Sequence, residues 1–295
     1  MASIGTFAFL GTPHFAAVIL KRLIQAGFIP KTVVTNPDQP LGRKKILTPP
    51  PAKQVVLDLP EDIRKTIRVF QPEKFDSEFL LALNHYDFFI VAAFSKIIPK
   101  AVLKIPRKGV IGVHPSLLPK LRGASPIQSA ILEGAGQTGT TLYLMDEKVD
   151  HGSILVQKTP ENTELDAITY PELEERLAEL SADALVEFLP KFADGLVTPQ
   201  PQDESAATFT KKFTTQDGFI PFDALERAEK EGGDIARDIN RKVRAFNPEP
   251  SAFTLNPSQG GLPKRMKILK TKIENGKLKL LTVQYEGKKP QSLLV

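Results

Sequence analysis

Two segments of the chain carry side chains that could move a proton. His114 follows the apolar run GVIGV, whereas Asp146, Asp150 and His151 follow the apolar run TTLYL. A carboxylate beside an imidazole can orient the ring and favour its charged form. Such a pair can exchange protons with a substrate. The residue types point to acid–base chemistry at His114, with Asp146 or Asp150 as partner; a structural histidine and solvated turn aspartates are the alternatives.

The composition excludes several other kinds of catalysis. The chain has no cysteine, which rules out thiolate nucleophiles, disulfides and cysteine-ligated metals. It lacks a Walker A sequence and a His-Glu-x-x-His pair, and its four histidines lack recognised metal spacing, so we expect no metal. Gly134, Gly136 and Gly139 match the G-x-G-x-x-G spacing, but they follow an expected helix and lead into a strand. A dinucleotide site has the reverse order, so we interpret Gly134 as a helix C-cap.

The charge of the chain is concentrated in two places. From residue 207 to the end, 17 Lys and Arg face 10 Asp and Glu, so this part carries +7 and the rest −2, giving the net +5. A second basic segment, residues 36–53, holds Arg43, Lys44 and Lys45 between prolines. Such asymmetry favours a polyanionic partner, and solvated basic surfaces are the alternative.

Alternating strands and helices must position His114 and its partner. Because a strand that runs into a helix and on to another strand is typical of a doubly wound sheet, the first two-thirds of the chain predicts an α/β domain. In such sheets ligands bind beyond the carboxyl ends of the strands, which is where His114 falls. Strands are expected at 6–10, 32–35, 68–70, 87–93, 109–113, 140–144 and 154–156, and helices at 16–25, 52–57, 77–84, 127–133 and 170–192.

The last third has a different pattern. Residues 195–207 are rich in Pro, Gln, Asp and Ser, which is typical of a linker. One helix is expected over 222–245, and short strands separated by turn sequences follow from residue 251. A helix followed by short strands predicts a small β-barrel. Since no apolar run approaches the ~20 residues of a membrane span, and the first residues lack a basic leader, we expect a cytoplasmic protein without membrane contact.

Several motifs, taken in order, resemble the methionyl-tRNA formyltransferase family. Members of that family transfer a formyl group from 10-formyltetrahydrofolate to the amino group of methionine on the initiator tRNA. The motifs are Phe9-Leu10-Gly11-Thr12-Pro13 with Phe15-Ala16, Pro37-Asp38 with Pro40 and Gly42-Arg43-Lys44, His114-Pro115-Ser116-Leu117-Leu118-Pro119 with Arg122-Gly123, Met145-Asp146 with Asp150 and Gly152, and Lys242-Val243-Arg244-Ala245-Phe246-Asn247-Pro248 with Pro250.

The resemblance implies a fold, ligands and site residues. It implies a Rossmann-like formyltransferase domain (1–194), a linker (195–207) and a basic, OB-like β-barrel domain that binds tRNA (208–295). It implies catalytic roles for His114 and Asp150, no metal, and initiator methionyl-tRNA as partner of a chain that we expect to be a monomer. The folate pocket would include Ser116, Leu117, Leu118 and Pro119, and tRNA would be bound by Arg43, Lys44, Lys45, Lys242 and Arg244.

One position departs from the family pattern. The family has an asparagine two residues before the histidine, and this chain has Gly112. The asparagine amide would help to bind the formyl oxygen, and loss of such a donor typically costs about 10²–10³ in rate. An ordered water, Asn84 or Ser95 could supply the donor instead. We therefore expect reduced activity unless a donor comes from elsewhere, and Gly112→Asn should then raise turnover.

Two other functions compete with tRNA formylation. Related formyltransferases act on amino sugar nucleotides or purine-pathway ribonucleotides, and the departure at Gly112 would also fit a tRNA-binding homologue with weak or no catalysis. A small acceptor gives no reason for the basic segment around Arg43 or for the +7 charge of the last third. These two features favour tRNA as the acceptor.

Overall fold

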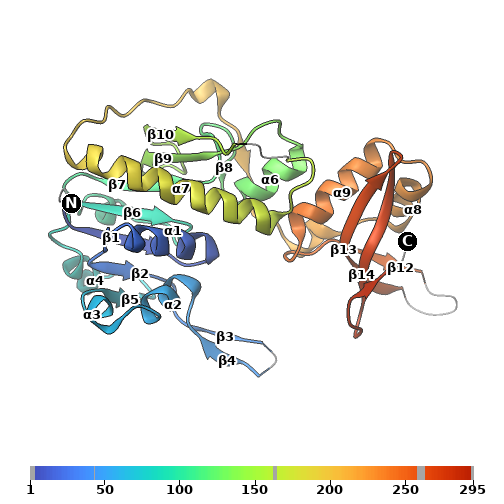
Figure 1. Cartoon of the computed structure of the whole chain (residues 1–295), viewed down its shortest axis with the longest axis horizontal. Helices are drawn as coiled ribbons and strands as arrows, with labels where there is room; N and C mark the ends of the chain where they lie inside the picture. Colours follow the sequence, from blue (N-terminus) through green and yellow to red (C-terminus); the bar gives the residue numbers. More distant parts are fainter. Residues whose placement is uncertain (1–3, 43, 162–164, 258–262, 294–295) are drawn as a thin grey trace. The chain divides into compact units, whose positions relative to one another are not determined.

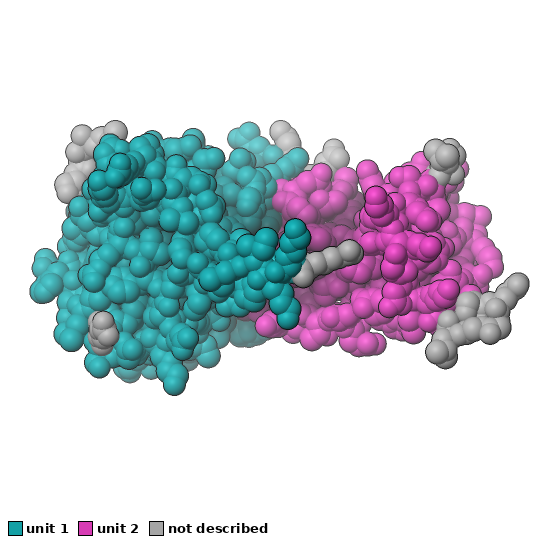
Figure 2. Space-filling view, turned by 90° about the horizontal axis from the view of Figure 1, so that it is seen from below, with its two compact units in different colours: residues 1–122, 138–161, 174–209 teal, residues 123–137, 162–173, 210–295 magenta. Residues whose placement is uncertain are grey.

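The computed structural model describes residues 4–42, 44–161, 165–257 and 263–293. Contacts between Cα atoms divide the chain into two compact units, coloured separately in Figure 2. Unit 1 comprises residues 1–122, 138–161 and 174–209, and unit 2 comprises residues 123–137, 162–173 and 210–295. The linear domain limits expected from the sequence stay a prediction. None of the helices in the described ranges is long and apolar enough to cross a membrane.

A seven-stranded sheet forms the centre of unit 1 (Figure 1). Its order is β10-β9-β7-β6-β1-β2-β5, with β5, β2, β1, β6 and β7 parallel and β9 and β10 antiparallel to their neighbours. The strands are β1 (Phe7–Gly11), β2 (Thr32–Val34), β5 (Arg68–Phe70), β6 (Phe88–Ala92), β7 (Val110–His114), β9 (Thr140–Leu144) and β10 (Ile154–Lys158). All residues of β1, β6 and β7 are buried, as both faces of a covered parallel sheet require. The Rossmann-like fold is confirmed.

Helices on the sheet follow the expected apolar periodicity. In α1 the residues Phe15, Ile19 and Leu23 recur every four positions and are buried, so one stripe of the helix meets the sheet. Along α7, Ser181 Oγ lies 2.6 Å from Thr140 Oγ1 of β9. The helices here are α1 (His14–Gln25), α2 (Pro51–Leu57), α3 (Glu61–Arg64), α4 (Ser77–Ala82), α5 (Lys100–Leu103) and α7 (Tyr170–Ala193), whose first turn falls in a segment of unit 2.

The basic segment of unit 1 contains a hairpin that the sequence did not predict. Strands β3 (Gln39–Leu41) and β4 (Ile46–Thr48) pair in antiparallel fashion, and in Figure 1 the hairpin projects away from the sheet of unit 1. Its turn holds Lys44 and Lys45, both exposed, whereas Arg43 lies outside the described residues. Leu41 and Ile46 beside the turn are also exposed, at 58% and 62%. The hairpin thus presents basic and apolar side chains together.

Unit 2 carries a four-stranded antiparallel sheet in the last third, where the sequence predicted a small β-barrel of short strands. The order is β12-β13-β14-β15, and its core joins Leu225, Ile239, Val243 and Ile268. The elements here are α6 (Pro126–Glu133), α8 (Phe222–Lys230), α9 (Asp234–Phe246), β12 (Phe253–Asn256), β13 (Lys264–Glu274), β14 (Lys277–Tyr285) and β15 (Gln291–Ser292). A short ladder pairs β8 (Arg122–Gly123) with β11 (Phe209–Thr210), and η1 (Glu204–Ala206) and η2 (Thr215–Gly218) are 3-10 turns.

Two glycines account for a wrong expectation in unit 2. The single helix expected over 222–245 is two helices, α8 and α9, because Gly232 and Gly233 have φ of +77° and +76°. A Cβ on Gly232 would also lie 2.3 Å from the carbonyl oxygen of Gly276. Only glycine adopts such a conformation without strain, so the helix ends here. The expected C-cap is confirmed: Gly134 follows α6 with φ of 60°.

Candidate active site

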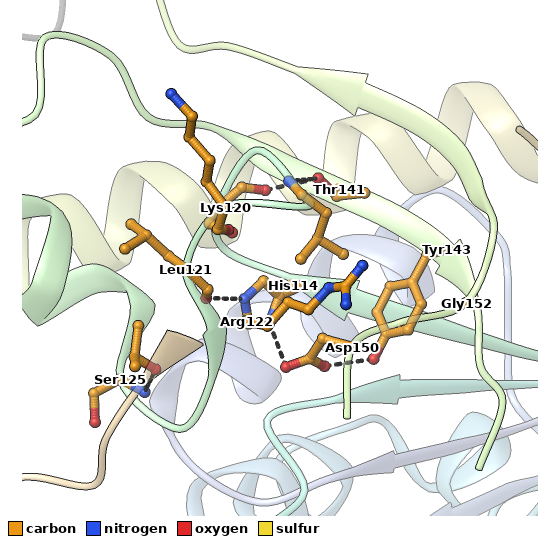
Figure 3. A network of polar contacts seen from close by, with 12 residues as sticks. His114, Lys120, Leu121, Arg122, Ser125, Thr141, Tyr143, Asp150 and Gly152 are labelled. Carbon is orange, nitrogen blue, oxygen red and sulfur yellow. Dashed lines mark hydrogen bonds and ion pairs between the residues drawn. The ribbon is translucent and has the colours of Figure 1, made fainter. Parts of the chain in front are cut away.

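His114 is the last residue of β7 and is 5% exposed. Its Nε2 lies 2.8 Å from the carbonyl oxygen of Leu121, which can only accept, so Nε2 carries a hydrogen. Its Nδ1 lies 3.5 Å from Oδ2 of Asp150 (Figure 3). The two segments that the sequence singled out therefore meet beyond the carboxyl end of β7, and Nδ1 is the nitrogen that faces the carboxylate.

Of the two aspartates considered for this role, Asp150 is the partner of His114. Asp150 has a φ of 47°, in the left-handed region that residues other than glycine rarely adopt. Its loop is held in place because Gln202 donates to the carbonyl oxygens of Asp150 and Gly152, at 2.8 Å each. Asp146 pairs instead with Nδ1 of His151. Backbone strain of this kind concentrates at functional sites.

Tyr143 occupies the space beside Gly112. The two residues are opposite each other on β9 and β7, and a Cβ on Gly112 would lie 2.4 Å from Cε1 and Cζ of the Tyr143 ring. The Tyr143 hydroxyl donates to Oδ1 of Asp150 at 2.7 Å (Figure 3). Burial, and secondly the charge of Asp150, raise the pKa of the Tyr143 phenol well above its usual value.

Asn84 and Ser95 were the two side chains considered as replacements for the asparagine donor, and neither is placed for that role. Ser95 Oγ accepts a hydrogen bond from Asn36 Nδ2 at 2.8 Å, and Asn84 is exposed in the turn after α4. Sequence reasoning missed Tyr143. Its position in TTLYL was visible, but its register opposite Gly112 is a property of the β7–β9 pairing.

The segment expected to contact folate is tied to the neighbouring strands. Thr141 Oγ1 donates to the carbonyl oxygen of Ser116 at 2.7 Å and accepts from the backbone N–H of Leu118 at 3.1 Å. Gln157 Nε2 donates to the carbonyl oxygen of Leu118 at 2.7 Å. Ser116 and Leu118 are buried, and Leu117 and Pro119 lie between and beside them at intermediate exposure. Thr141 and Gln157 are supporting residues that sequence reasoning missed, although a polar threonine within an apolar strand was a signal.

Arg122 joins the site to a segment expected to be a linker. Its guanidinium is almost fully buried, with Nη2 2.7 Å from Gln202 Oε1 and 2.6 Å from Glu204 Oε1. The Arg122 guanidinium, through its hydrogen bonds to Glu204, lowers the pKa of that carboxyl below its usual value. Gln200 exchanges two backbone hydrogen bonds with Ile154 of β10. Residues 200–204 are therefore part of the support of the site.

The basic residues expected to bind tRNA differ in their surroundings. Lys44 and Lys45 are exposed, whereas Lys242 Nζ donates to the carbonyl oxygen of Phe219 at 3.0 Å. Arg244 is 8% exposed, and its Nη1 donates to the carbonyl oxygens of residues 165 and 168 at 2.9 and 2.7 Å. Burial lowers the pKa of both Lys242 and Arg244. These contacts give both residues a role inside unit 2, and tRNA binding by them stays a prediction.

Within the described ranges no three His, Asp or Glu side chains are grouped so that they could hold a metal ion. The arrangement offers an imidazole with one nitrogen fixed, a carboxylate that accepts from Tyr143 and faces the other ring nitrogen, and a tied loop beside them. Such a site can stabilise an oxyanion and accept a proton, as acyl transfer to an amine requires.

Comparison with known proteins identifies the class of reaction. A family model described as "Formyl transferase" matches residues 6–189, so formyl transfer is the reaction class that the fold and the site define. The methionyl-tRNA formyltransferase of Bacillus licheniformis is 39% identical over 251 residues, covering 84% of this chain and 73% of that protein. That of Roseiflexus sp. is 38% identical over 313 residues, covering 96% and 88%. The chain belongs to the methionyl-tRNA formyltransferase family and is a formyltransferase.

Solved structures share the fold at low sequence identity. The methionyl-tRNA formyltransferase from Clostridium thermocellum has a TM-score of 0.59 and 16% identity, covering 95% of this chain and 98% of that chain. An N-formyltransferase from Helicobacter canadensis, solved with folinic acid and dTDP-3-aminofucose, has a TM-score of 0.61 and 17% identity, covering 92% and 88%. At this identity both structures bear on the fold alone.

Proposed function

We propose that this chain transfers the formyl group of 10-formyltetrahydrofolate to the amino group of methionyl initiator tRNA. The observation that carries the proposal is His114 Nδ1 facing Asp150 Oδ2 at 3.5 Å, beyond the end of β7, in a chain of this family. Two solved structures of this fold were obtained with folates, HypX from Aquifex aeolicus with tetrahydrofolic acid and the sugar 3N-formyl transferase WlaRD with 5-N-formyl-THF, which supports a folate donor. The cytoplasm is the compartment we propose, with the chain acting as a monomer.

The proposed mechanism gives each proton in the reaction a carrier. The methionine amine adds to the formyl carbon, and the formyl oxygen becomes an oxyanion that accepts a hydrogen bond from protonated Nδ1 of His114. Asp150 takes the proton that the amine loses, directly or through a water molecule. When the bond between the formyl carbon and the folate nitrogen breaks, that nitrogen takes up the same proton. The fixed Nε2–H of His114 keeps the ring oriented throughout.

The substrate-binding roles follow the same proposal. The folate lies against Ser116, Leu117, Leu118 and Pro119, a loop that Thr141 and Gln157 hold in shape. The acceptor end of the tRNA meets the β3–β4 hairpin, where Lys44 and Lys45, with Arg43 outside the described residues, offer positive charge beside exposed Leu41. Phosphate contacts also come from the basic last third of the chain. Of the two residues in the family's pattern, Lys242 can contribute to them, whereas Arg244 is 8% exposed and supports unit 2 through carbonyl oxygens.

A parallel assay of three acceptors tests the function. The full chain is given radiolabelled 10-formyltetrahydrofolate with methionyl initiator tRNA, an amino sugar nucleotide or a purine-pathway ribonucleotide. We expect label only in N-formylmethionyl-tRNA. Transfer to a small acceptor would replace the proposed function, and tRNA binding without any transfer would assign the chain to non-catalytic homologues. Binding should also weaken with salt by a log–log slope of roughly −0.7 to −0.9 per phosphate contact.

A further inference from the structure

Gly112 and Tyr143 form a matched pair in the active site. They are opposite each other on antiparallel β7 and β9, and the Tyr143 ring lies where a side chain at 112 would begin. The Cβ of any larger residue would be 2.4 Å from two ring carbons, closer than real Cβ contacts come. Tyr143 is 3% exposed, so the ring has no open space into which it could turn without moving its neighbours.

The Tyr143 hydroxyl makes a hydrogen bond to Asp150, in addition to the packing of its ring. It donates to Oδ1 of Asp150 at 2.7 Å, while Oδ2 of the same carboxylate faces His114 Nδ1 at 3.5 Å. Its raised pKa keeps the phenol protonated, so it acts as a donor to the charged carboxylate. Figure 3 shows His114, Asp150 and Tyr143 in a row, with the carboxylate between the two rings. A phenylalanine would fill the same volume without fixing Asp150.

We propose that Tyr143 is a positioning residue of this active site: its ring fills the space that a side chain at position 112 would need, and its hydroxyl donates the hydrogen bond that fixes Asp150 beside His114. Gly112 and Tyr143 are then matched to each other. The inference rests on the proposed function for the reaction that the pair serves, whereas the packing of residues 112 and 143 stands by itself. Gly112→Asn alone is therefore expected to slow the enzyme, in place of the gain that the sequence suggested.

A double-mutant cycle tests the pairing. The chain is compared with Gly112→Asn, Tyr143→Val and the double variant, in which asparagine and the smaller β-branched valine together nearly conserve the buried volume. We expect each single variant to lose roughly 100-fold in kcat and the double variant to be at least tenfold faster than Tyr143→Val. Losses that simply multiply, or a Gly112→Asn chain as fast as the parent, would overturn the pairing.

Tyr143→Phe separates the hydroxyl from the ring. The charged and titratable groups near Asp150 include His114 and Tyr143, with Asp146 and His151 in the same loop. Without the Tyr143 donor the charged form of the carboxylate is less favoured, so the acid limb of the kcat/KM profile should move up by about one pH unit. We expect kcat to fall roughly 10- to 100-fold, with KM for both substrates within about twofold.

The control for the lost hydroxyl is Tyr86→Phe. Tyr86 is a partly buried tyrosine of the same unit, and its hydroxyl lies 2.5 Å from Thr32 Oγ1, outside the active site. This variant should keep the parent pH profile and turnover. A Tyr143→Phe profile that coincides with the parent, or that shifts only as much as Tyr86→Phe, would reduce Tyr143 to a core residue and overturn the proposal.

Thermal unfolding of the full chain separates failure of the inference from failure of the proposed function. In the parent background Gly112→Asn should lower Tm by roughly 3–10 °C, as overpacking does, and in the Tyr143→Val background it should lower Tm little or raise it. If the parent does not formylate methionyl-tRNA but this pattern holds, the function fails and the match between Gly112 and Tyr143 stands. If the parent is active and Gly112→Asn leaves Tm unchanged in both backgrounds, the inference alone fails.

Discussion

Two of the histidine–carboxylate pairs in the described part of the chain use aspartates of the loop between β9 and β10, and they differ in burial. In the first pair the side chains of His114 and Asp150 are 7% and 16% exposed, whereas those of His151 and Asp146 in the second are 28% and 42% exposed. The second pair has the shorter separation between nitrogen and oxygen. The distance between the charged groups alone therefore does not identify the pair proposed to react. Water and salt screen the electrostatic interaction of exposed groups, and they screen that of buried groups much less.

Loss of the buried imidazole should have the largest effect. We expect His114→Ala to lower kcat by about 10³-fold, because it removes both the oxyanion donor and the group that Asp150 faces. His151→Ala is the matched control and should stay within about threefold of the parent. Steady-state formylation of methionyl-tRNA measures both. An active His114→Ala chain, or an inactive His151→Ala chain, would reverse the assignment of the two pairs.

Neutralising the carboxylates gives the second contrast. Asp150→Asn keeps the shape of the side chain but removes the proton acceptor, and kcat should fall about 10²-fold. Asp146→Asn, which acts on the exposed pair, should change kcat less than about fivefold. The same formylation assay across pH 6–9 gives both rates. Equal losses in the two variants would mean that the pairs act as one unit.

Arg122 supports the first pair through Gln202, and its replacement should have a moderate effect. Lysine keeps the charge but has no planar fork to reach both Gln202 and Glu204. We expect Arg122→Lys to lower kcat about tenfold, since the Asp150 loop is held by Gln202. Arg107→Lys, at a 72% exposed arginine of the same unit, should leave kcat unchanged and is the control. A parent-like Arg122→Lys would remove this support from the account.

Glu204 should give the smallest effect, on stability and not on rate. Its pKa is lowered by Arg122, so the charged carboxylate adds stability above the ordinary glutamate pKa and loses it as the pH falls through the folded value. We expect Glu204→Gln to lower Tm slightly at pH 7, with the difference disappearing as the pH falls below the ordinary glutamate pKa. Because the side chain is 58% exposed, solvent screening keeps this effect small. A difference that grows at low pH would contradict this sign.

The sequence predicted what local patterns determine. The apolar runs before His114 and Asp150 are strands β7 and β9, and the rule that sites lie beyond strand ends predicted where His114 would be. The break between α8 and α9 was also visible, as Gly232-Gly233, but the apolar positions on both sides suggested one helix. Arg244 lies one turn after Asn240 on the buried face of α9. This helical spacing indicated a buried arginine, but the family motif that contains Arg244 suggested tRNA binding instead.

What the sequence could not predict depends on pairings between distant segments. The contact of Tyr143 with Gly112 needs β9 to pair with β7 in one register, and a shift by one residue would turn Tyr143 to the other face. The role of Gln202 needs a proline-rich segment to return to the Asp150 loop, which composition alone describes as a linker. That His114 would meet an aspartate of the loop after β9 was therefore predictable, and the residues that hold these two side chains were not.

Single-turnover formyl transfer tests the central claim most directly. The full parent chain, in excess over methionyl initiator tRNA and saturated with radiolabelled 10-formyltetrahydrofolate, is mixed and quenched over time beside Asp150→Asn. The account predicts complete conversion to N-formylmethionyl-tRNA by the parent, despite Gly112, and a rate about 10²-fold lower for Asp150→Asn. Parent chain that binds the tRNA without forming product, or Asp150→Asn at the parent rate, would contradict it.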